Sequence, residues 1–443
     1  MAERTAQSTI ESDTAGTITV PEARRVAIGA LVGTAMEWYD FFLFNTAAAL
    51  VFNVQYFATD NVAIATMASF ATLAIGFVVR PLGGILFGSL GDKIGRRAVL
   101  LTTIVGIGIA TALIGVLPNY ASIGVWAPIV LILLRVLQGL FVGGEWSGAM
   151  TIAVENAPLS MRARFAALPQ VGSPIGTVLS SGAFFFLTLW LSQDDFDAWG
   201  WRIPFLVAIP LLLIAVWIRA RLEESPVFKA IQARGESERS PVKAVFVQSW
   251  RQVLVGVGVA FLGVGGFYLV TTFVVSYGVR ALGLEPNMLL LATVIAALFE
   301  IAVILHGGRL GEKHGASRVV IWGGIVTAVI AFPAFVLIGT GLPLLVIVGI
   351  TVAVCSLSYC YAASGTILTG LFPPATRYTG VALAQNGAGV VSGIVPLLAT
   401  AFVASAGDAW WPAAVMLVVI AVVTAVCGRL APSLSQRLEG FTH

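Results

Sequence analysis

Five ionisable side chains lie inside long apolar segments of this sequence, where ordinary surface charges do not belong. Glu37 and Asp40 occur in the first such segment, Arg135 and Glu145 in the fourth, and Glu300 in the eighth. An ionisable group within a membrane-spanning helix costs several kcal/mol, and such groups are usually functional. Each of the five is therefore a candidate functional residue if the apolar segments cross a bilayer.

The depths of Glu37, Asp40 and Arg135 suit a group that binds protons. At about 1.5 Å of rise per residue, Glu37 lies roughly 16 Å and Asp40 roughly 21 Å into its segment, and Arg135 roughly 18 Å in from the other side. In an apolar layer of about 30 Å all three lie near the middle, and the spacing of three directs both acids toward one face. Burial favours a neutral carboxyl and a nearby guanidinium favours a charged one, so such a group can bind and release a proton. The alternative is a permanent structural ion pair.

Arg135 is also suited to holding an anion, because its planar guanidinium matches a carboxylate. Gln138 and Trp146 lie three and eleven residues further on, along the same helical stripe. We expect this stripe to line a site for a small cyclic or aromatic acid, with Tyr39 and Tyr268 as further candidates for contact with the substrate. Ordinary helix packing is the alternative, above all for tryptophan, which favours membrane interfaces.

Glu145 lies ten residues beyond Arg135, near the inner surface of the membrane, where a gate is a better interpretation than a substrate site. Arg80, deep in the second apolar segment and near the same surface, is the candidate partner of Glu145. Glu300 lies in the inner half of the eighth segment, and the sequence offers no partner for it. A functional and a structural role are equally open for Glu300.

The composition identifies the class of protein that positions these residues. Of 443 residues, 58% are hydrophobic and 11% are charged, and the mean hydropathy is +0.94. Soluble domains carry about a quarter charged residues, so the chain is an integral membrane protein. A net charge of +3 is too small to indicate nucleic acid as a partner. Three cysteines in apolar runs and three histidines without a nucleophile predict neither a metal site nor an enzyme.

Twelve apolar runs reach the roughly 20 residues that cross a bilayer, which predicts an all-α membrane fold of twelve transmembrane helices. The runs begin near Val26, Val62, Ala98, Ile123, Ala163, Arg202, Gln252, Met288, Val319, Leu342, Tyr378 and Trp410. Lysines and arginines concentrate in the connections on one side, so both termini should lie in the cytoplasm. The connections on the other side carry Asp60, Asp194, Asp195, Asp197, Glu285 and Asp408, with Arg280 as the clearest basic exception.

A polar central segment divides the twelve spans into two groups of six. We predict a cytoplasmic N-terminal tail over residues 1–25 and an N-terminal six-helix bundle over 26–220. A central cytoplasmic loop follows over 221–250, then a C-terminal six-helix bundle over 251–430 and a cytoplasmic C-terminal tail over 431–443.

The two halves repeat one another in sequence. The loop after the second span reads Gly88-Ser-Leu-Gly-Asp92-Lys-Ile-Gly95-Arg96-Arg97, and the loop after the eighth reads Gly308-Arg-Leu-Gly-Glu312-Lys-His-Gly315-Ala-Ser-Arg318. Residues 158–162 and 373–377, which both begin with proline and end with arginine, match in the same way. Repeated halves around a midplane site are an architecture of secondary transporters. No G-x-x-x-x-G-K-S/T loop occurs, so ATP-driven pumping is not supported.

The segment from Gly88 to Arg97 resembles the signature loop of the major facilitator superfamily, G-x-x-x-D-R/K-x-G-R/K-R/K. Other segments are similar to the metabolite:proton symporter branch of that superfamily, with shikimate and α-ketoglutarate carriers as the nearest members. These segments are Glu37-Trp-Tyr-Asp40-Phe, Arg80-Pro-Leu-Gly-Gly, Arg135-Val-Leu-Gln-Gly-Leu-Phe-Val-Gly-Gly-Glu145-Trp, Trp199-Gly-Trp-Arg-Ile-Pro-Phe and Glu223-Glu-Ser-Pro-Val-Phe. The resemblance covers essentially the whole chain.

The resemblance implies residue roles. In this family an acid in span one and an arginine in span four often form the proton-coupling pair, which here would be Asp40 or Glu37 with Arg135. The signature loop is the family's cytoplasmic latch, in which the acid caps a helix or pairs with the other half. Gating is expected of Asp92, Arg96 and Arg97 on this resemblance, of Glu145 and Arg80 by their position, and also of Arg162 and Arg377. The second-half loop departs from the pattern, with Glu312 as its acid, which puts its gating role in doubt.

The leading hypothesis is an importer that couples protons to the uptake of a small organic acid by rocking of its two halves. It would act as a monomer in the plasma or inner membrane, with the proton as coupling ion and no other cofactor. A carrier of a zwitterion such as proline or betaine is the alternative within the fold, and competition by carboxylates without an amine distinguishes the two. A membrane receptor or sensor is the alternative from another class, and it would bind its ligand without accumulating it.

Overall fold

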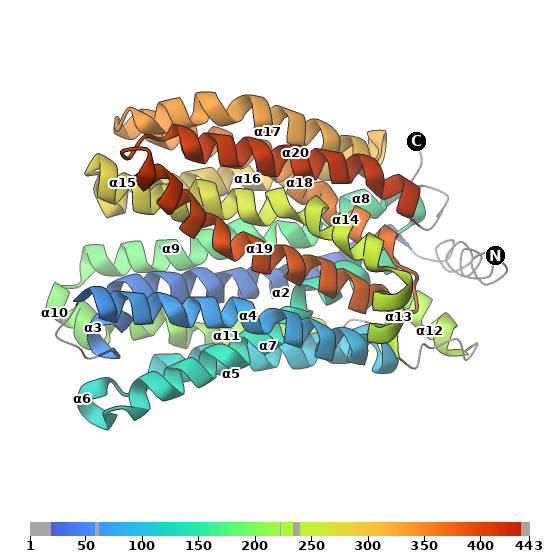
Figure 1. Ribbon diagram of the computed structural model, residues 1–443. Coiled ribbons are helices and arrows are strands. Elements are labelled where there is room, and N and C mark those ends of the chain that lie inside the picture. The colour runs from blue at the N-terminus through green and yellow to red at the C-terminus, as the bar shows by residue number, and fades with distance from the viewer. Residues whose placement is uncertain (1–18, 58–61, 222, 234–239, 436–443) are drawn as a thin grey trace.

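The computed structural model describes residues 19–57, 62–221, 223–233 and 240–435. Within these residues twelve helices are long and apolar enough to cross a membrane, which confirms the predicted all-α membrane fold. The helices lie side by side in one bundle, and its first and last helices begin and end at the same end of the molecule (Figure 1). Asp60 and most of the two predicted tails lie outside the described residues.

The N-terminal half contains the first six spans. Its long helices are α2 (Val20–Ala47), α4 (Val62–Ile94), α5 (Arg96–Val116), α7 (Trp126–Glu155), α8 (Arg162–Gln170) with α9 (Gly172–Trp190), and α11 (Arg202–Ala220). Short connections are the π-helical turns Ala48–Phe52 and Phe196–Gly200, the 3-10 turn Leu159–Met161, α3 (Asn53–Gln55), α6 (Tyr120–Ile123) and α10 (Gln193–Asp195). Helix α2 begins earlier than the bundle boundary predicted at residue 26, because Pro21 lies in its first turn and Thr19 and Glu22 form a capping box.

The C-terminal half contains the other six spans. Its helices are α14 (Trp250–Phe261) with α15 (Val274–Leu282), α16 (Pro286–His314), α17 (Ala316–Gly339), α18 (Pro343–Leu371), α19 (Arg377–Ser405) and α20 (Trp411–Leu434). Two π-helical turns, Leu262–Gly266 and Leu269–Phe273, join α14 to α15 within a single span. The predicted central loop holds two short helices, α12 (Pro226–Ala233) and α13 (Pro241–Gln248).

The repeated loops form the same tight turn in both halves. Gly95 separates α4 from α5 with φ 116°, and Gly315 separates α16 from α17 with φ 90°. Glycine adopts such positive φ values without the steric cost that a Cβ brings. The glycine shared by the two sequence repeats is thus the residue that reverses the chain, and it fixes the acid three residues before it at the end of a helix.

Helices α4 and α7 approach closely enough to exclude side chains from their crossing. A Cβ added to Gly83 would lie 1.9 Å from the carbonyl oxygen of Leu140, and one added to Gly143 would lie 2.1 Å from that of Arg80. Small residues allow this approach between helices in a membrane. The crossing holds the backbone of Arg80 against α7, near the middle of the bundle.

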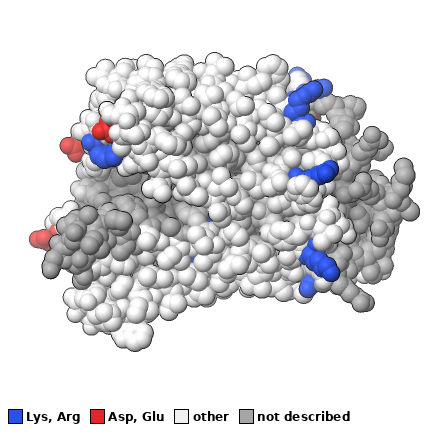
Figure 2. Space-filling model, viewed as in Figure 1, with Lys and Arg blue, Asp and Glu red and all other residues white. Residues whose placement is uncertain are grey.

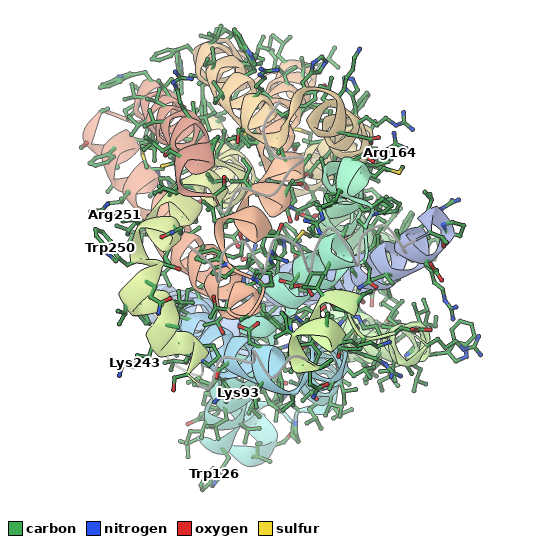
Figure 3. The ribbon with its side chains drawn as sticks, turned by 90° about the vertical axis from the view of Figure 1, so that its right-hand side faces the viewer. Lys93, Trp126, Arg164, Lys243, Trp250 and Arg251 are labelled. Atoms are coloured by element: carbon green, nitrogen blue, oxygen red, sulfur yellow. The ribbon has the colours of Figure 1, made fainter. Side chains whose placement is uncertain are left out.

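Charged residues divide the molecule into two ends. Lysines and arginines gather at the end where α2 begins and α20 ends, here called the basic end, and Figure 3 looks onto it. The other end, here called the acidic end, shows most of the acidic side chains in Figure 2. It carries Asp194, Asp195, Asp197, Glu285 and Asp408, with Arg280 against Asp408 at 3.3 Å.

Aromatic rings join the two halves in the middle of the bundle. Trp38 of α2 meets Phe267 edge to face, with 5.7 Å between ring centroids, and Phe41 stacks on Tyr268 at 5.6 Å. Phe77 of α4 packs against Tyr268 at 5.7 Å. The two halves are thus in direct contact through aromatic rings around Phe267 and Tyr268.

Candidate functional site

Asp40 and Arg135 form an ion pair inside the N-terminal half. Arg135 Nη1 of α7 lies 3.6 Å from Asp40 Oδ2 of α2, and both side chains are almost fully buried. The hydroxyl of Thr111 and the amide of Gln138 both donate to Asp40 Oδ1. Arg135 also lies over the ring of Phe44, 4.2 Å from its centroid. The ion pair expected from the depths of Asp40 and Arg135 is therefore present. Together with the hydrogen bond from Thr111 of α5, it joins α2, α5 and α7.

Glu37 does not share this environment, contrary to the prediction that both acids face one way. Its side chain lines a cavity between the two halves, and in the described part of the chain Glu37 Oε2 has no hydrogen-bond partner. Residues three apart on a helix differ by about 60° in direction. Because α2 lies between the interior of its own half and the other half, that difference sends Asp40 inward and Glu37 to the interface.

The cavity between the halves is small and polar on several sides. Glu37, Arg80 and Trp146 line it from the N-terminal half, and Tyr268, Gln385 and Asn386 from the C-terminal half. Its volume is about 30 Å³, which is room for a water molecule or two. The Arg80 guanidinium lies 4.7 Å from the ring centroid of Phe77. An organic substrate would enter only after the halves move apart.

Of the predicted substrate contacts, Trp146 and Tyr268 line this cavity, whereas Arg135, Gln138 and Tyr39 do not. Arg135 and Gln138 are occupied with Asp40, and the Tyr39 hydroxyl donates to the carbonyl of Pro204 in α11 at 2.5 Å. Of the predicted stripe on α7, Trp146 therefore faces the cavity, whereas Arg135 and Gln138 face the interior of the N-terminal half. The guanidinium in the cavity belongs to Arg80, which the sequence had suggested as a gate.

Glu145 pairs with Arg219 rather than with the predicted Arg80. Both carboxylate oxygens accept hydrogen bonds from the Arg219 guanidinium, and the Thr103 hydroxyl donates to Glu145 Oε2 at 2.6 Å. Arg219 also donates to the carbonyl of Leu100 at 2.8 Å. Sequence reasoning missed Arg219, although an arginine in the last turn of an apolar span was a visible signal.

Asp92 lies at the N-terminus of a helix in the opposite half. Its carboxylate accepts from the backbone N–H of Tyr378 at 3.2 Å and of Thr379 at 2.9 Å, and from the Thr379 hydroxyl at 2.7 Å. These N–H groups belong to the first turn of α19, which has no partner for them within the helix. Asp92 also lies 3.6 Å from Arg96. This placement matches the helix cap that the family resemblance implied.

Glu155, which the sequence did not indicate as a functional residue, pairs with two arginines at the basic end. Its carboxylate lies 3.4 Å from Arg96 Nε and 3.2 Å from Arg377 Nη1, and it accepts from the Ser225 hydroxyl. Arg96 Nη2 reaches across to the carbonyl of Pro374 at 2.8 Å. An acid at the end of a span resembles a surface residue in sequence, and here it is fully buried.

The remaining predicted gate residues differ in their contacts. The Arg97 guanidinium donates to the carbonyl of Ala220 and its backbone N–H donates to Glu224 of the central loop, so the contacts described for Arg97 do not reach the C-terminal half. Arg162 is buried at the start of α8. Arg164 of α8 pairs with Glu312 of the other half at 2.7 Å, so the acid of the second loop binds a side chain, whereas Asp92 accepts from backbone N–H groups of α19. Figure 3 shows Arg164 toward the right-hand side of the basic end.

Glu300 is buried in the C-terminal half, beside Ser358 of α18. Its Oε2 atom has no hydrogen-bond partner among the described residues, and no ion pair is found for it there. The same residues contain no group of three or more histidine, cysteine or acidic side chains placed to hold a metal ion. Glu300 thus lies outside both the central cavity and the contacts at the basic end.

Two family models match the chain. The model described as "Sugar (and other) transporter" matches residues 26–253, and the model described as "Major Facilitator Superfamily" matches residues 279–439. Together they cover both halves of the bundle.

Similar proteins of known name are membrane transporters. The shikimate transporter of Escherichia coli K12 is 34% identical over 94% of this chain and 96% of its own length. The proline/betaine transporter of Salmonella typhimurium LT2 is 32% identical over 98% of this chain and 89% of its own length. Among solved structures, the proton:xylose symporter XylE bound to 6-bromo-6-deoxy-D-glucose has a TM-score of 0.73 at 17% identity, over 96% of this chain and 99% of that one. At that identity the likeness concerns the fold.

Proposed function

We propose, on the premise that this chain belongs to the major facilitator superfamily of membrane transporters, that it imports a small organic acid together with protons. Membership makes the chain a multi-pass membrane protein and a transporter rather than an enzyme, as the sequence predicted. The proposed coupling of an organic acid to protons rests on one observation. The central cavity is lined by both the Arg80 guanidinium and the Glu37 carboxyl group, and the buried pair of Asp40 and Arg135 lies in the same half.

Arg80 is the proposed binding group for the substrate carboxylate. It is the cationic side chain among those that line the cavity, and a guanidinium binds a carboxylate through two parallel hydrogen bonds. Trp146 and Tyr268 offer ring surfaces for a cyclic acid, and the amides of Gln385 and Asn386 offer donors and acceptors for its hydroxyl groups. An anion bound to Arg80 adds a negative charge to a site that already holds the carboxyl of Glu37.

The proposed proton sites are Asp40 and Glu37. A proton on either acid offsets the negative charge that the substrate brings, so proton and anion bind more favourably together than apart. Protonation of Asp40 also removes its attraction to Arg135 and loosens the link between α2 and α7. Asp40 is the first candidate because a change in its ion pair moves helices, and Glu37 is the second.

The proposed cycle alternates between openings at the two ends. Hydrogen bonds and ion pairs that join the halves in the described residues gather toward the basic end, through Asp92, Glu155 and Glu312. The state described here is therefore closed at that end. We assign the basic end to the cytoplasm, since lysine and arginine favour cytoplasmic connections, and the protein to the inner or plasma membrane, acting as a monomer.

A panel of organic acids tests the proposed substrate class. A ligand at a hundred times its Kd adds about 2.7 kcal/mol to the free energy of unfolding, so a rise in the unfolding midpoint identifies binders. We expect carboxylates without an amine, shikimate first, to stabilise the purified protein, and accumulation in proteoliposomes to separate a transporter from a receptor. Stabilisation by proline or betaine alone would contradict the proposal.

A zwitterionic substrate is the second candidate, and one observation favours it. Trp38, Phe41, Phe77, Trp146 and Tyr268 surround or line the cavity, and aromatic faces bind quaternary ammonium groups through cation–π attraction. In that case Glu37 would face the cationic group and Arg80 the carboxylate. Competition between betaine and shikimate for the same site distinguishes the two substrates.

A further inference from the structure

A groove with three arginines opens on the outer surface of the N-terminal half at the basic end. It lies between the first turns of α2 and the last turn of α11, and its volume is about 510 Å³. Arg24, Arg25 and Arg221 provide its charge. Ile28 and Trp217 are part of its apolar wall, with exposed fractions of 41% and 58%. The groove thus combines positive charge near the membrane surface with an apolar wall that faces the lipid.

Unlike several arginines of the fold, the three groove arginines have no carboxylate partner among the described residues. Arg96, Arg135, Arg219 and Arg377 each pair with a buried acid. In the described parts of the chain, the groove arginines form no ion pair and their side chains are exposed.

Protein contacts position two of the groove arginines without neutralising them. Arg25 Nη2 donates to the carbonyl of Arg221 at 3.4 Å, and the Arg221 guanidinium lies 3.9 Å from the ring centroid of Trp217. Glu22, two residues before Arg24, bonds to Thr19, and Glu223, two residues after Arg221, pairs with Lys229 at 3.3 Å. Three positive charges therefore line a groove whose lining residues include no acid.

We propose that this groove binds the head group of an anionic phospholipid. Guanidinium groups bind phosphate oxygens through paired hydrogen bonds, and basic pockets between transmembrane helices on the cytoplasmic side suit anionic head groups. The apolar wall would lie along the first part of the acyl chains, and tryptophan favours this depth of the membrane. A free phosphate or a soluble anion would gain nothing from the exposed Ile28 and Trp217.

Lipid bound here would hold together two helices that carry the buried charges. Helix α2 carries Glu37 and Asp40, and α11 carries Arg219, which binds Glu145. Each arginine near an anionic surface contributes about fivefold in affinity. Loss of all three is expected to weaken binding of the anionic lipid on the order of a hundredfold.

The test measures the unfolding midpoint of the purified full-length protein in detergent during titration with dioleoylphosphatidylglycerol. We expect a rise in the midpoint for the parent protein, little rise with dioleoylphosphatidylcholine and none with inorganic phosphate. A variant with Arg24→Gln, Arg25→Gln and Arg221→Gln should lose the rise, measured against the same variant without lipid. A second variant with lysine at all three positions should keep part of the rise, because lysine retains the charge but not the paired hydrogen bonds of a guanidinium.

The matched control removes the same charge elsewhere on the basic end, with Lys243→Gln, Arg251→Gln and Arg318→Gln. Arg251 also lies over a tryptophan, Trp250, at 5.3 Å. Figure 3 shows Lys243, Trp250 and Arg251 at one edge of this end. The control should keep the rise, and an equal loss in both triple variants would overturn the proposal in favour of general attraction between charges.

Two further outcomes would also overturn the proposal. One is an equal rise with phosphatidylcholine or with phosphate, which would remove the role of an anionic lipid. The other concerns the acidic residues of the N-terminal segment, which are the competing occupant. If Glu3→Gln, Glu11→Gln and Asp13→Asn together lower the midpoint without lipid as much as the arginine variant does, the groove belongs to that segment.

Discussion

Replacing Asp92 with asparagine is expected to open the basic end. The carboxylate accepts three hydrogen bonds from Tyr378 and Thr379 across the interface and is 3% exposed. Asparagine keeps one acceptor oxygen, but its amide nitrogen would face N–H donors and it carries no charge for the N-terminus of α19. A hydrogen bond to a charged group contributes about 1.5–3 kcal/mol. We therefore expect a loss of about 2 kcal/mol from the state closed at the basic end.

That loss corresponds to a shift of about 30-fold toward the state open at the basic end. The reporter is Ser147→Cys, which lines the central cavity and is 2% exposed, in a background without Cys355, Cys360 and Cys427. In inside-out vesicles, a membrane-impermeant maleimide should label this cysteine faster in Asp92→Asn than in the parent. Turnover should slow, whereas substrate affinity, measured by thermal stabilisation, should stay near that of the parent.

Two controls make the Asp92 result specific. Asp194→Asn removes an exposed acid at the acidic end and should leave labelling unchanged. Thr379→Val removes one donor of the same contact, so its effect combined with Asp92→Asn should be less than additive. Unchanged labelling together with unchanged transport would refute this reasoning and leave the loop as a determinant of topology.

Three further substitutions test separate parts of the site. Arg80→Gln should weaken binding of a carboxylate substrate by about 10- to 100-fold, because one charge-assisted contact is lost. An unchanged Kd in the thermal assay would exclude Arg80 as the group that binds the substrate carboxylate. Glu145→Ala should lower the free energy of unfolding by about 3–5 kcal/mol, because Arg219 would stay buried without its partner; a loss below about 1 kcal/mol, typical of exposed pairs, would contradict this. Glu300→Gln should leave stability and uptake close to those of the parent, because the described residues offer no cation that needs its charge, and loss of uphill uptake in this variant would instead make Glu300 a proton site.

The fold was predictable because each span carries its own signal. Twelve apolar runs, the basic connections and the repeated Gly95 and Gly315 turns are all local in sequence. The meeting of Asp40 and Arg135 was also predictable, since depth in a membrane can be counted along a helix. The placement of Asp92 against α19 required the family resemblance, because nothing local shows which helix the acid caps.

The direction of each side chain was not predictable in the same way. The depth of a residue in the membrane does not specify which way its side chain points around the helix. Glu37 faces the central cavity and Asp40 faces Arg135 because of how α2 is rotated between its neighbours. The pairing of Glu145 with Arg219 depends on which helices are adjacent, and the repeats do not specify it. Glu155 was missed because an acid at a helix end is usually solvated, and here the other half covers it.

Uptake into proteoliposomes tests the central proposal most directly. With the acid that best stabilises the protein as labelled substrate, an inward proton gradient should concentrate it, and a protonophore should abolish the accumulation. Asp40→Asn should still bind and exchange substrate, because the amide keeps the shape and one acceptor oxygen, but it should not accumulate substrate against a gradient. Accumulation by Asp40→Asn equal to that of the parent would move the proton site to Glu37 or elsewhere. Equal accumulation by the parent under a sodium gradient alone would contradict proton coupling altogether.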